Sequence, residues 1–315
     1  MTLQYDSEFA SLAGPVLQQL AQTPRPAAHD IATRRAMMEA MTNENFELPD
    51  NVEKLTHHVP APDGHQVTIY HFRLRGATRE AGEPAIVHIH GGGFIALSAA
   101  QTSEPLAIAT ARTGVQILTV DYRLAPEHPY PAPLDDCWAA LQWVYEHTGQ
   151  LSIDLSRIAV MGESAGGGLA VALALKARDY TLAPPLAKQI LMYPMLDDRT
   201  ATNHAGDLAF WTLDDNITGW TAYLGSDVGT DKVVPYAAPA RVQSVEGLPP
   251  LYLDCPQLDI FVHEGIEYVH RFVAANIPTE CHIYPGLPHG FEALAPSASI
   301  TSHVVANRHK AMSSF

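Results

Sequence analysis

The sequence predicts an α/β fold in which a mostly parallel central sheet is flanked by helices on both faces. Short apolar runs recur along the chain, and helix-compatible stretches separate them. This alternation is typical of parallel sheets, because the connection between two parallel strands is long enough to hold a helix. With 315 residues and 47% apolar content, the chain can bury a full core.

The first predicted element of the sheet is an antiparallel hairpin. Residues 54–59 and 67–74 alternate apolar and polar side chains around the turn sequence Pro62-Asp63-Gly64. The later apolar runs are typical of strands buried on both faces and lie at 85–89, 115–120, 158–161, 189–193, 251–253 and 281–284. Helices are predicted at 104–112, 134–147, 167–178 and 261–275, the last with Val262, Ile266, Val269 and Val273 on one stripe.

Two regions do not follow the strand and helix alternation. Residues 1–50 precede the first strand. Residues 197–225 lie between two predicted strands and contain a group of aromatic side chains. We expect both regions to form a cap over the ends of the strands. For any single member of this set, an ordinary core position is the simpler interpretation: Met37, Met38, Met41, Phe210, Trp211, Trp220 and Tyr223.

Charge and composition argue against several classes of partner. The formal net charge is −15 without a basic cluster, which disfavours nucleic acid and anionic lipid headgroups. The start of the chain carries Asp6 and Glu8 and lacks the pattern of a secretory signal, so a cytoplasmic location is expected. The longest uncharged stretch, 85–103, is interrupted by three glycines and two histidines and does not predict a membrane span.

Cysteines and histidines do not predict a metal or redox site. The three cysteines are scattered, without a C-x-x-C pair, and reduced thiols are expected. The 16 histidines are not accompanied by cysteine or carboxylate ligands at metal-site spacing. We therefore expect no metal and no cofactor.

A serine stands at a sharp turn between a predicted strand and a predicted helix. The sequence there is Gly162-Glu163-Ser164-Ala165-Gly166. Such a turn strains the serine backbone, and bulky side chains two residues to either side would collide, which explains the two glycines. Ser164 then projects above the first turn of a helix, whose free amides and dipole favour negative charge. The pattern predicts a nucleophile, although it also arises by chance.

A glycine run follows another predicted strand. In His90-Gly91-Gly92-Gly93-Phe94, three glycines are costly unless the backbone must come close to another group. The amides of Gly92 and Gly93, together with that of Ala165, are predicted to form an oxyanion hole. His90 is expected to brace this loop, and the alternative is a merely flexible loop.

A serine nucleophile needs a base and an acid later in the chain. His289 is the predicted base, because it follows the last strand in a loop fixed by prolines, with Gly290 beside it. The acid must lie between Ser164 and His289, and the candidates are Asp259, Asp254, and Asp197 or Asp198. Asp259 is favoured because its loop lets the side chain turn across the carboxyl end of the sheet. Capping of the next helix is the alternative role for these acids.

A loop rich in proline, charged and aromatic residues follows the strand at 115–120. We expect residues 121–131 to be a rigid scaffold, in which Arg123 and Glu127 could form a partly buried pair.

Five motifs in this order resemble the hormone-sensitive-lipase-like esterases of the α/β-hydrolase fold. They are residues 90–94, 121–131, 162–167, 257–265 and 288–291. The resemblance implies a triad of Ser164, Asp259 and His289, the oxyanion hole above, and a catalytic domain at 51–315 with a helical cap from 1–50 and an insertion at about 197–225. It also implies short or medium acyl chains, with Phe94 and Trp211 lining the pocket. The chain departs from the family at Glu163, where aspartate is commoner, and at Val262 and His263, where an arginine and an acid are usual, so Asp254 stays the second candidate.

The predicted function is therefore hydrolysis of short- to medium-chain carboxylic esters through an acyl-enzyme. A thioesterase or deacetylase, and an amidase or peptidase, would use the same triad. A ligand-binding receptor on a hydrolase scaffold belongs to a different class and is expected to lack a triad member. The sheet edge near the last strand offers a place where two copies could pair as a homodimer.

Overall fold

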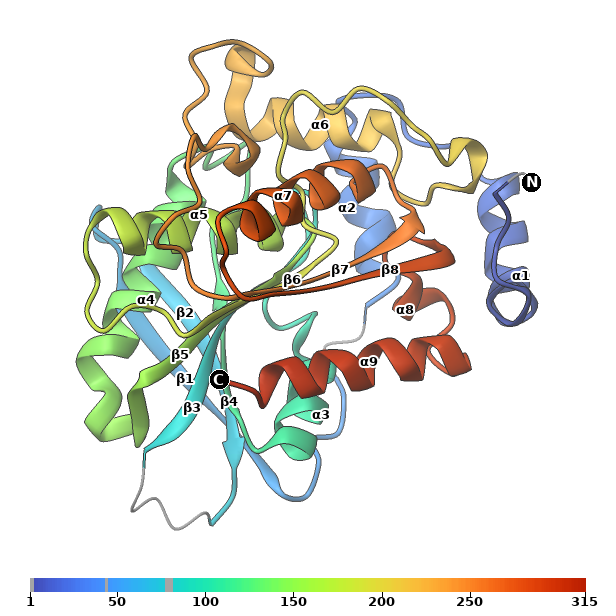
Figure 1. The fold of residues 1–315 in the computed structure, drawn as a ribbon. Coiled ribbons are helices and arrows are strands. Elements are labelled where there is room, and N and C mark those ends of the chain that lie inside the picture. Colours follow the sequence, from blue (N-terminus) through green and yellow to red (C-terminus); the bar gives the residue numbers. More distant parts are fainter. Residues whose placement is uncertain (1–2, 43–44, 77–81) are drawn as a thin grey trace.

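The computed structural model describes residues 3–42, 45–76 and 82–315. Its centre is an eight-stranded sheet in the order β1-β2-β4-β3-β5-β6-β7-β8 (Figure 1). The two pairings at the β1 edge, β1 with β2 and β2 with β4, are antiparallel, and the other pairings are parallel. The strands are β1 (Val52–Pro60), β2 (Gln66–Leu74), β3 (Glu83–Ile89), β4 (Gln116–Asp121), β5 (Ile153–Glu163), β6 (Lys188–Met192), β7 (Leu251–Leu258) and β8 (Thr279–Pro288).

Each strand lies where the sequence predicts one, and the turn at Pro62-Asp63-Gly64 closes the β1–β2 hairpin. β3, β4 and β6 consist mostly of buried residues, as expected for central strands. The prediction that 281–284 is buried on both faces is wrong: Cys281 and Ile283 are exposed. The reason is that β8 is an edge strand, so one face of this segment meets solvent. Pairing of two copies at this edge stays a prediction.

Helices cover both faces of the sheet. One face carries α4 (Ala132–Leu151), α5 (Ala165–Asp179) and α7 (Val262–Ala274), and the other carries α3 (Ser103–Thr113) and α9 (Ser299–Met312) (Figure 1). α8 (Phe291–Leu294) is a single turn after β8. None of the described helices is both long and apolar enough to cross a bilayer.

The helix α7 is present, but only half of its predicted apolar stripe faces the core: Val262 is buried and Val269 is partly buried against the core. Ile266 and Val273 are exposed, whereas Gly265, Tyr268 and Phe272 are buried. The helix approaches β7 through the small Gly265, where an added Cβ would lie 3.5 Å from Leu253, and larger aromatic side chains fill the space beyond. The buried face of α7 therefore includes Gly265, Tyr268 and Phe272 and excludes Ile266 and Val273.

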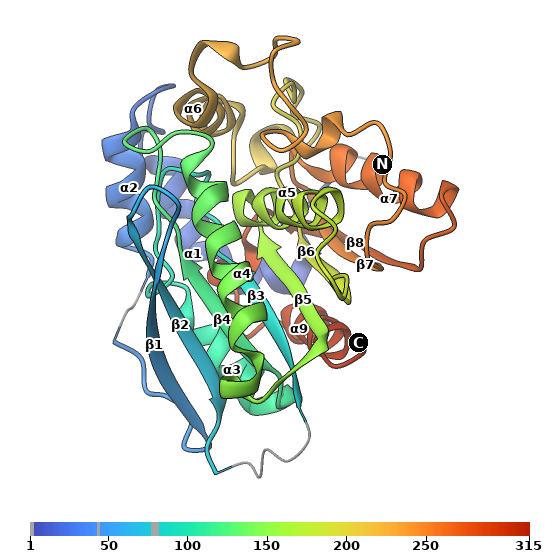
Figure 2. The same ribbon diagram turned by 90° about the vertical axis from the view of Figure 1, so that its left-hand side faces the viewer.

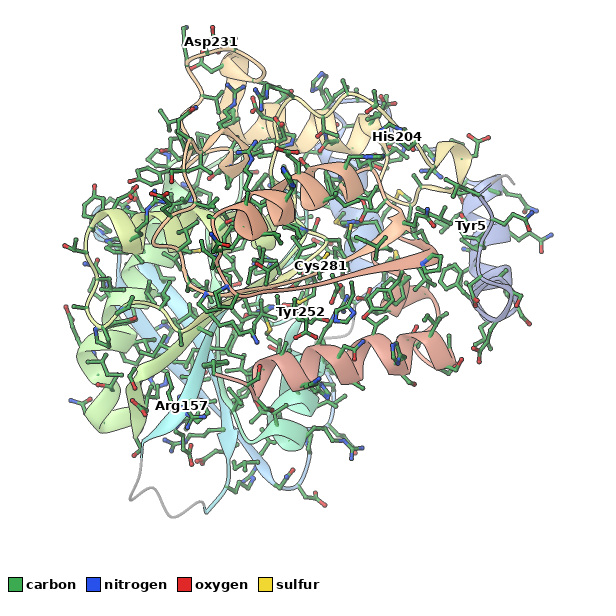
Figure 3. The ribbon with its side chains drawn as sticks, viewed as in Figure 1. Tyr5, Arg157, His204, Asp231, Tyr252 and Cys281 are labelled. Atoms are coloured by element: carbon green, nitrogen blue, oxygen red, sulfur yellow. The ribbon has the colours of Figure 1, made fainter. Side chains whose placement is uncertain are left out.

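The residues before the sheet lie against the segment between β6 and β7. α1 (Ser7–Gln22) and α2 (Ile31–Glu39) precede the sheet, and the later segment contains η1 (Gly206–Leu208), α6 (Leu213–Leu224), η2 (Gly225–Asp227) and η3 (Pro239–Arg241). Figure 2 shows α2 and α6 beyond the end of the sheet to which β5 points. Arg34 of α2 pairs with Asp215 of α6, and the Tyr5 hydroxyl donates to the Leu208 carbonyl 3.0 Å away, where Figure 3 labels Tyr5 beside α1.

The suggested pair of Arg123 and Glu127 does not form. Arg123 binds Asp136 of α4 in a bidentate pair and also contacts Asp63 of the hairpin turn, 2.6 Å away. Glu127 instead accepts two hydrogen bonds from Arg35 of α2. The two side chains point away from each other because each binds a different neighbouring element. Through them, the loop at 121–131 contacts the β1–β2 hairpin, α4 and α2.

Candidate active site

Ser164 lies between the last residue of β5 and the first residue of α5. Its backbone is strained, with φ 54° and ψ −122°. A Cβ added to Gly162 would overlap the backbone of Gly166, and one added to Gly166 would overlap the carbonyls of Ile89 and His90. The glycines on both sides of the serine are therefore required by close backbone contact. The turn places the Ser164 side chain at the N-terminus of α5.

The structure brings Ser164, His289 and Asp259 together. His289 Nε2 lies 3.0 Å from Ser164 Oγ, and His289 Nδ1 lies 2.5 Å from Asp259 Oδ2. The rings of Tyr193, Phe261 and Trp211 surround the imidazole at centroid distances of 4.6, 5.3 and 6.1 Å. His289 is 7% exposed and Asp259 is 1% exposed, so bulk water reaches little of this chain of hydrogen bonds.

The other candidate acids are bound elsewhere. Asp254 lies inside β7, because the strand runs five residues beyond the predicted end, and both of its carboxylate oxygens accept hydrogen bonds from Arg308. Asp198 makes the same kind of bidentate pair with Arg241. Asp197 pairs with Arg199. Asp259 comes directly after β7, and its second oxygen accepts the Phe261 amide, which fixes the carboxylate toward His289.

Three backbone amides near the serine have no acceptor among the residues that the structure describes. Within the described part of the chain, the amides of Gly92, Gly93 and Ala165 donate no hydrogen bond. His90 lies beside this loop with its ring stacked on Tyr122, 4.2 Å between centroids, and its Nδ1 is 2.8 Å from the Gly91 carbonyl. Burial lowers the pKa of His90, so its ring is neutral at ordinary pH.

Comparison with known proteins shows the family to which this chain belongs. A family model described as the alpha/beta hydrolase fold matches residues 86–293, which include Ser164, Asp259 and His289. The chain belongs to the α/β-hydrolase family.

Several relatives of this α/β hydrolase are named esterases. The carboxylesterase NlhH of Mycobacterium tuberculosis is 37% identical over 225 residues, covering 69% of this chain and 70% of its own. Esterase LipI of the same organism is 35% identical over 218 residues, covering 69% and 68%. Among solved structures, a bacterial heroin esterase superposes with a TM-score of 0.89 at 34% identity, covering 98% of this chain and 97% of its own. The predicted fold and the resemblance to hormone-sensitive-lipase-like esterases are confirmed.

Glu163 is a residue of this α/β hydrolase whose contacts the sequence did not reveal. One oxygen accepts the Gly91 amide at 3.1 Å, and the other lies 2.8 Å from His88 Nε2 on β3. His88 in turn contacts Thr119 of β4 at 2.9 Å. Burial works to raise the pKa of Glu163, but the attraction of His88 and these hydrogen bonds bring it below its usual value. The residue before the serine thus ties the turn to the glycine loop. The sequence offered one sign of this contact, namely His88 within the otherwise apolar run at 85–89.

The two aromatic residues predicted to line the substrate pocket occupy different environments. Trp211 is 5% exposed and lies next to His289 and to Gly93, where an added Cβ would come within 2.5 Å of the indole. Phe94 stacks on Tyr223 of α6 at 4.2 Å and also contacts Trp220, so it joins the glycine loop to α6. A pocket between α1, α2 and the residues before α6 includes Trp211 but not Phe94.

No metal-binding group is found in the described ranges: no three histidine, cysteine, aspartate or glutamate side chains lie close enough together to hold an ion.

Glu264, in the first turn of α7, anchors the start of the segment between β6 and β7. Its Oε2 accepts the Asp197 amide at 2.7 Å and the Thr200 hydroxyl at 3.1 Å, while Oε1 has no partner among the described residues. Burial raises the pKa of Glu264 well above its usual value. The carboxyl is therefore protonated in the folded chain over a pH range in which the unfolded chain has lost the proton.

This raised pKa predicts a loss of stability as the pH increases. Between the unfolded and the folded pKa, the folded state binds more protons, so the free energy of unfolding falls with rising pH, by at most about 1.4 kcal/mol per pH unit. Glu264→Gln removes this titration. In urea unfolding at pH 5, 6, 7 and 8, the variant should gain stability relative to the wild type as the pH rises. Glu267→Gln, which replaces an exposed residue on the same helix, is the control, and its stability relative to the wild type should not change with pH. If the stability of Glu264→Gln relative to the wild type is also independent of pH, the prediction is refuted.

Proposed function

We propose that this α/β hydrolase is a serine carboxylesterase that works through an acyl-enzyme. The observation that carries the proposal is the continuous chain of hydrogen bonds from Ser164 through His289 to Asp259, with three free amides beside the serine. A nucleophile, a base, an orienting acid and oxyanion donors are the set that acyl transfer needs. The esterase names of its relatives support ester hydrolysis over other acyl transfers.

The reaction follows from these positions. His289 Nε2 takes the proton of Ser164 as the oxygen attacks the ester carbonyl, and the new negative oxygen accepts hydrogen bonds from Gly92, Gly93 and Ala165. His289 then gives the proton to the departing alcohol, which leaves an ester on Ser164. Water then attacks the acyl carbon while it loses a proton to the same imidazole. The bond to Ser164 Oγ breaks, His289 returns the proton to this oxygen, and the carboxylic acid leaves. Asp259 holds His289 in the tautomer whose Nε2 is free to accept, and it stabilises the imidazolium.

Short acyl chains are part of the proposal. The resemblance implies them, and one relative is named ethyl acetate hydrolase from Pseudomonas putida, 27% identical over 90% of this chain. The aromatic rings around His289 leave the serine in a confined setting, which suits small esters.

A covalent label tests the nucleophile directly. Incubation with a fluorophosphonate should stop hydrolysis of p-nitrophenyl acetate and add one phosphonyl group, which peptide mass spectrometry should place on Ser164. An acetyl thioester and an acetyl anilide, assayed in parallel, separate ester hydrolysis from thioesterase and amidase activity. A label on another residue, or ester turnover that continues in fully labelled protein, would exclude the proposal.

A further inference from the structure

A cavity of about 100 Å³ lies beside the candidate active site, between α1, α2 and the residues that precede α6. We call it the methionine chamber, after the side chains that dominate its lining: Leu20, Met37, Met38, Met41, Phe210 and Trp211. Methionine side chains are flexible and polarisable, so they adapt to apolar ligands of varied shape.

Two charged residues of the chamber lining, Arg34 and Asp215, pair with each other. Arg34, only 3% exposed, binds Asp215 at 2.8 Å and donates to the carbonyls of Pro26, Ala27 and Asp30. The guanidinium of Arg25 donates to the carbonyls of Ala209 and Phe210. Most of the lining is apolar, and the pair of Arg34 and Asp215 carries no net charge. The chamber therefore suits an alkyl chain, and each methylene buried there is worth about fourfold in affinity.

Trp211 separates the chamber from the serine. The benzo edge of its indole lies against Gly93, since a Cβ at Gly93 would be 2.5 Å from Cη2 and 2.8 Å from Cζ2. Its ring also lies 6.1 Å from that of His289, while the same side chain lines the chamber. The indole Nε1 has no hydrogen-bond partner among the described residues, so no such bond resists its displacement. Arg25 fixes the two carbonyls before it, which leaves the side chain as the movable part.

We propose that the methionine chamber is a subsite for an unbranched alkyl arm of the ester, that Trp211 closes it, and that the arm reaches it only when the indole moves aside, so that Trp211 limits the length of the arm. The inference rests on the proposed function, because it needs Ser164 as the reacting group. With Trp211 in its observed position, the arm has to end at the indole. When the indole is removed, the space at Ser164 and the chamber become one continuous apolar groove.

The test compares kcat/KM along two series of substrates. p-Nitrophenyl acetate, butyrate and octanoate vary the acyl arm, whereas ethyl, butyl and octyl acetate vary the alcohol arm. Trp211→Ala should raise the ratio of the longest to the shortest member at least tenfold in one series, since several methylenes gain contacts at about fourfold each. The series that responds identifies which arm enters the chamber.

A second substitution that fills the chamber again distinguishes the proposed role of Trp211 from a general loosening of the active site. The double variant Trp211→Ala/Met37→Trp should return the ratio toward the wild-type value. Trp143→Ala, which removes a ring packed on His57 and His147, is the matched control and should leave the ratio unchanged. Trp211→Leu serves if Trp211→Ala does not fold, as judged by thermal unfolding.

Two results would overturn the inference: a ratio that Trp211→Ala and Trp211→Leu leave unchanged in both series, or an increase that persists in the double variant. Either can occur while hydrolysis still depends on Ser164, in which case the proposed function stands. Hydrolysis that is independent of Ser164 removes the proposed function itself.

Discussion

Ser164→Ala should lower kcat for p-nitrophenyl acetate by roughly a million-fold, as is seen when the nucleophile of a serine triad is removed. The reason is that Ser164 Oγ is the oxygen held 3.0 Å from His289 Nε2, so its loss removes the atom that forms the acyl-enzyme. The oxyanion amides and the substrate site remain, and the residual rate should stay above that of the uncatalysed reaction. Steady-state rates at saturating substrate, corrected for spontaneous hydrolysis, measure the effect.

A matched serine variant separates the chemical effect from a change in folding. Ser302→Ala replaces an exposed serine on α9 and should keep the wild-type rate. Both variants should unfold at nearly the wild-type temperature, because replacing Oγ of Ser164 removes one small polar atom. Turnover by Ser164→Ala within tenfold of the wild type would show that another residue is the nucleophile.

Asp259→Asn should lower kcat by about ten-thousandfold with little change in stability. Asparagine has nearly the same volume, but its amide can hold His289 in the wrong tautomer and cannot stabilise the imidazolium by charge. KM should change much less than kcat, since Asp259 lies behind the imidazole and away from the substrate. A full kcat and KM determination with p-nitrophenyl butyrate gives this comparison.

Asp254→Asn is the natural comparison, because this carboxylate is equally buried but binds Arg308. Breaking one side of a buried ion pair costs about 3–5 kcal/mol, so this variant should lose stability. At a temperature where it is folded, its kcat should stay near that of the wild type. If the two variants exchange these phenotypes, the catalytic acid is Asp254 and the assignment to Asp259 fails.

Local patterns in the sequence were enough to predict most of the fold. The order of strands and helices follows from periodicity, and the turn at Ser164 follows from glycines that leave room for close backbone contact. The predictions that were wrong concern which face of a strand or helix is buried. The sequence predicts that residues 281–284 are buried on both faces, because it does not show that β8 lies at the edge of the sheet. For α7, the sequence predicts one stripe of four β-branched residues, but Ile266 and Val273 are exposed, and Gly265, Tyr268 and Phe272 are buried.

The sequence by itself determined the type of each element, the strained position of Ser164 and the run of glycines, because these depend on residues within a few positions of one another. The tertiary structure decided which distant side chains meet. It placed Asp259 against His289 and Asp254 against Arg308, directed Arg123 to Asp136, and set Trp211 between Gly93 and the methionine chamber. These choices depend on the direction in which each side chain leaves its strand, helix or loop, and that direction is fixed only when the sheet and the helices pack together.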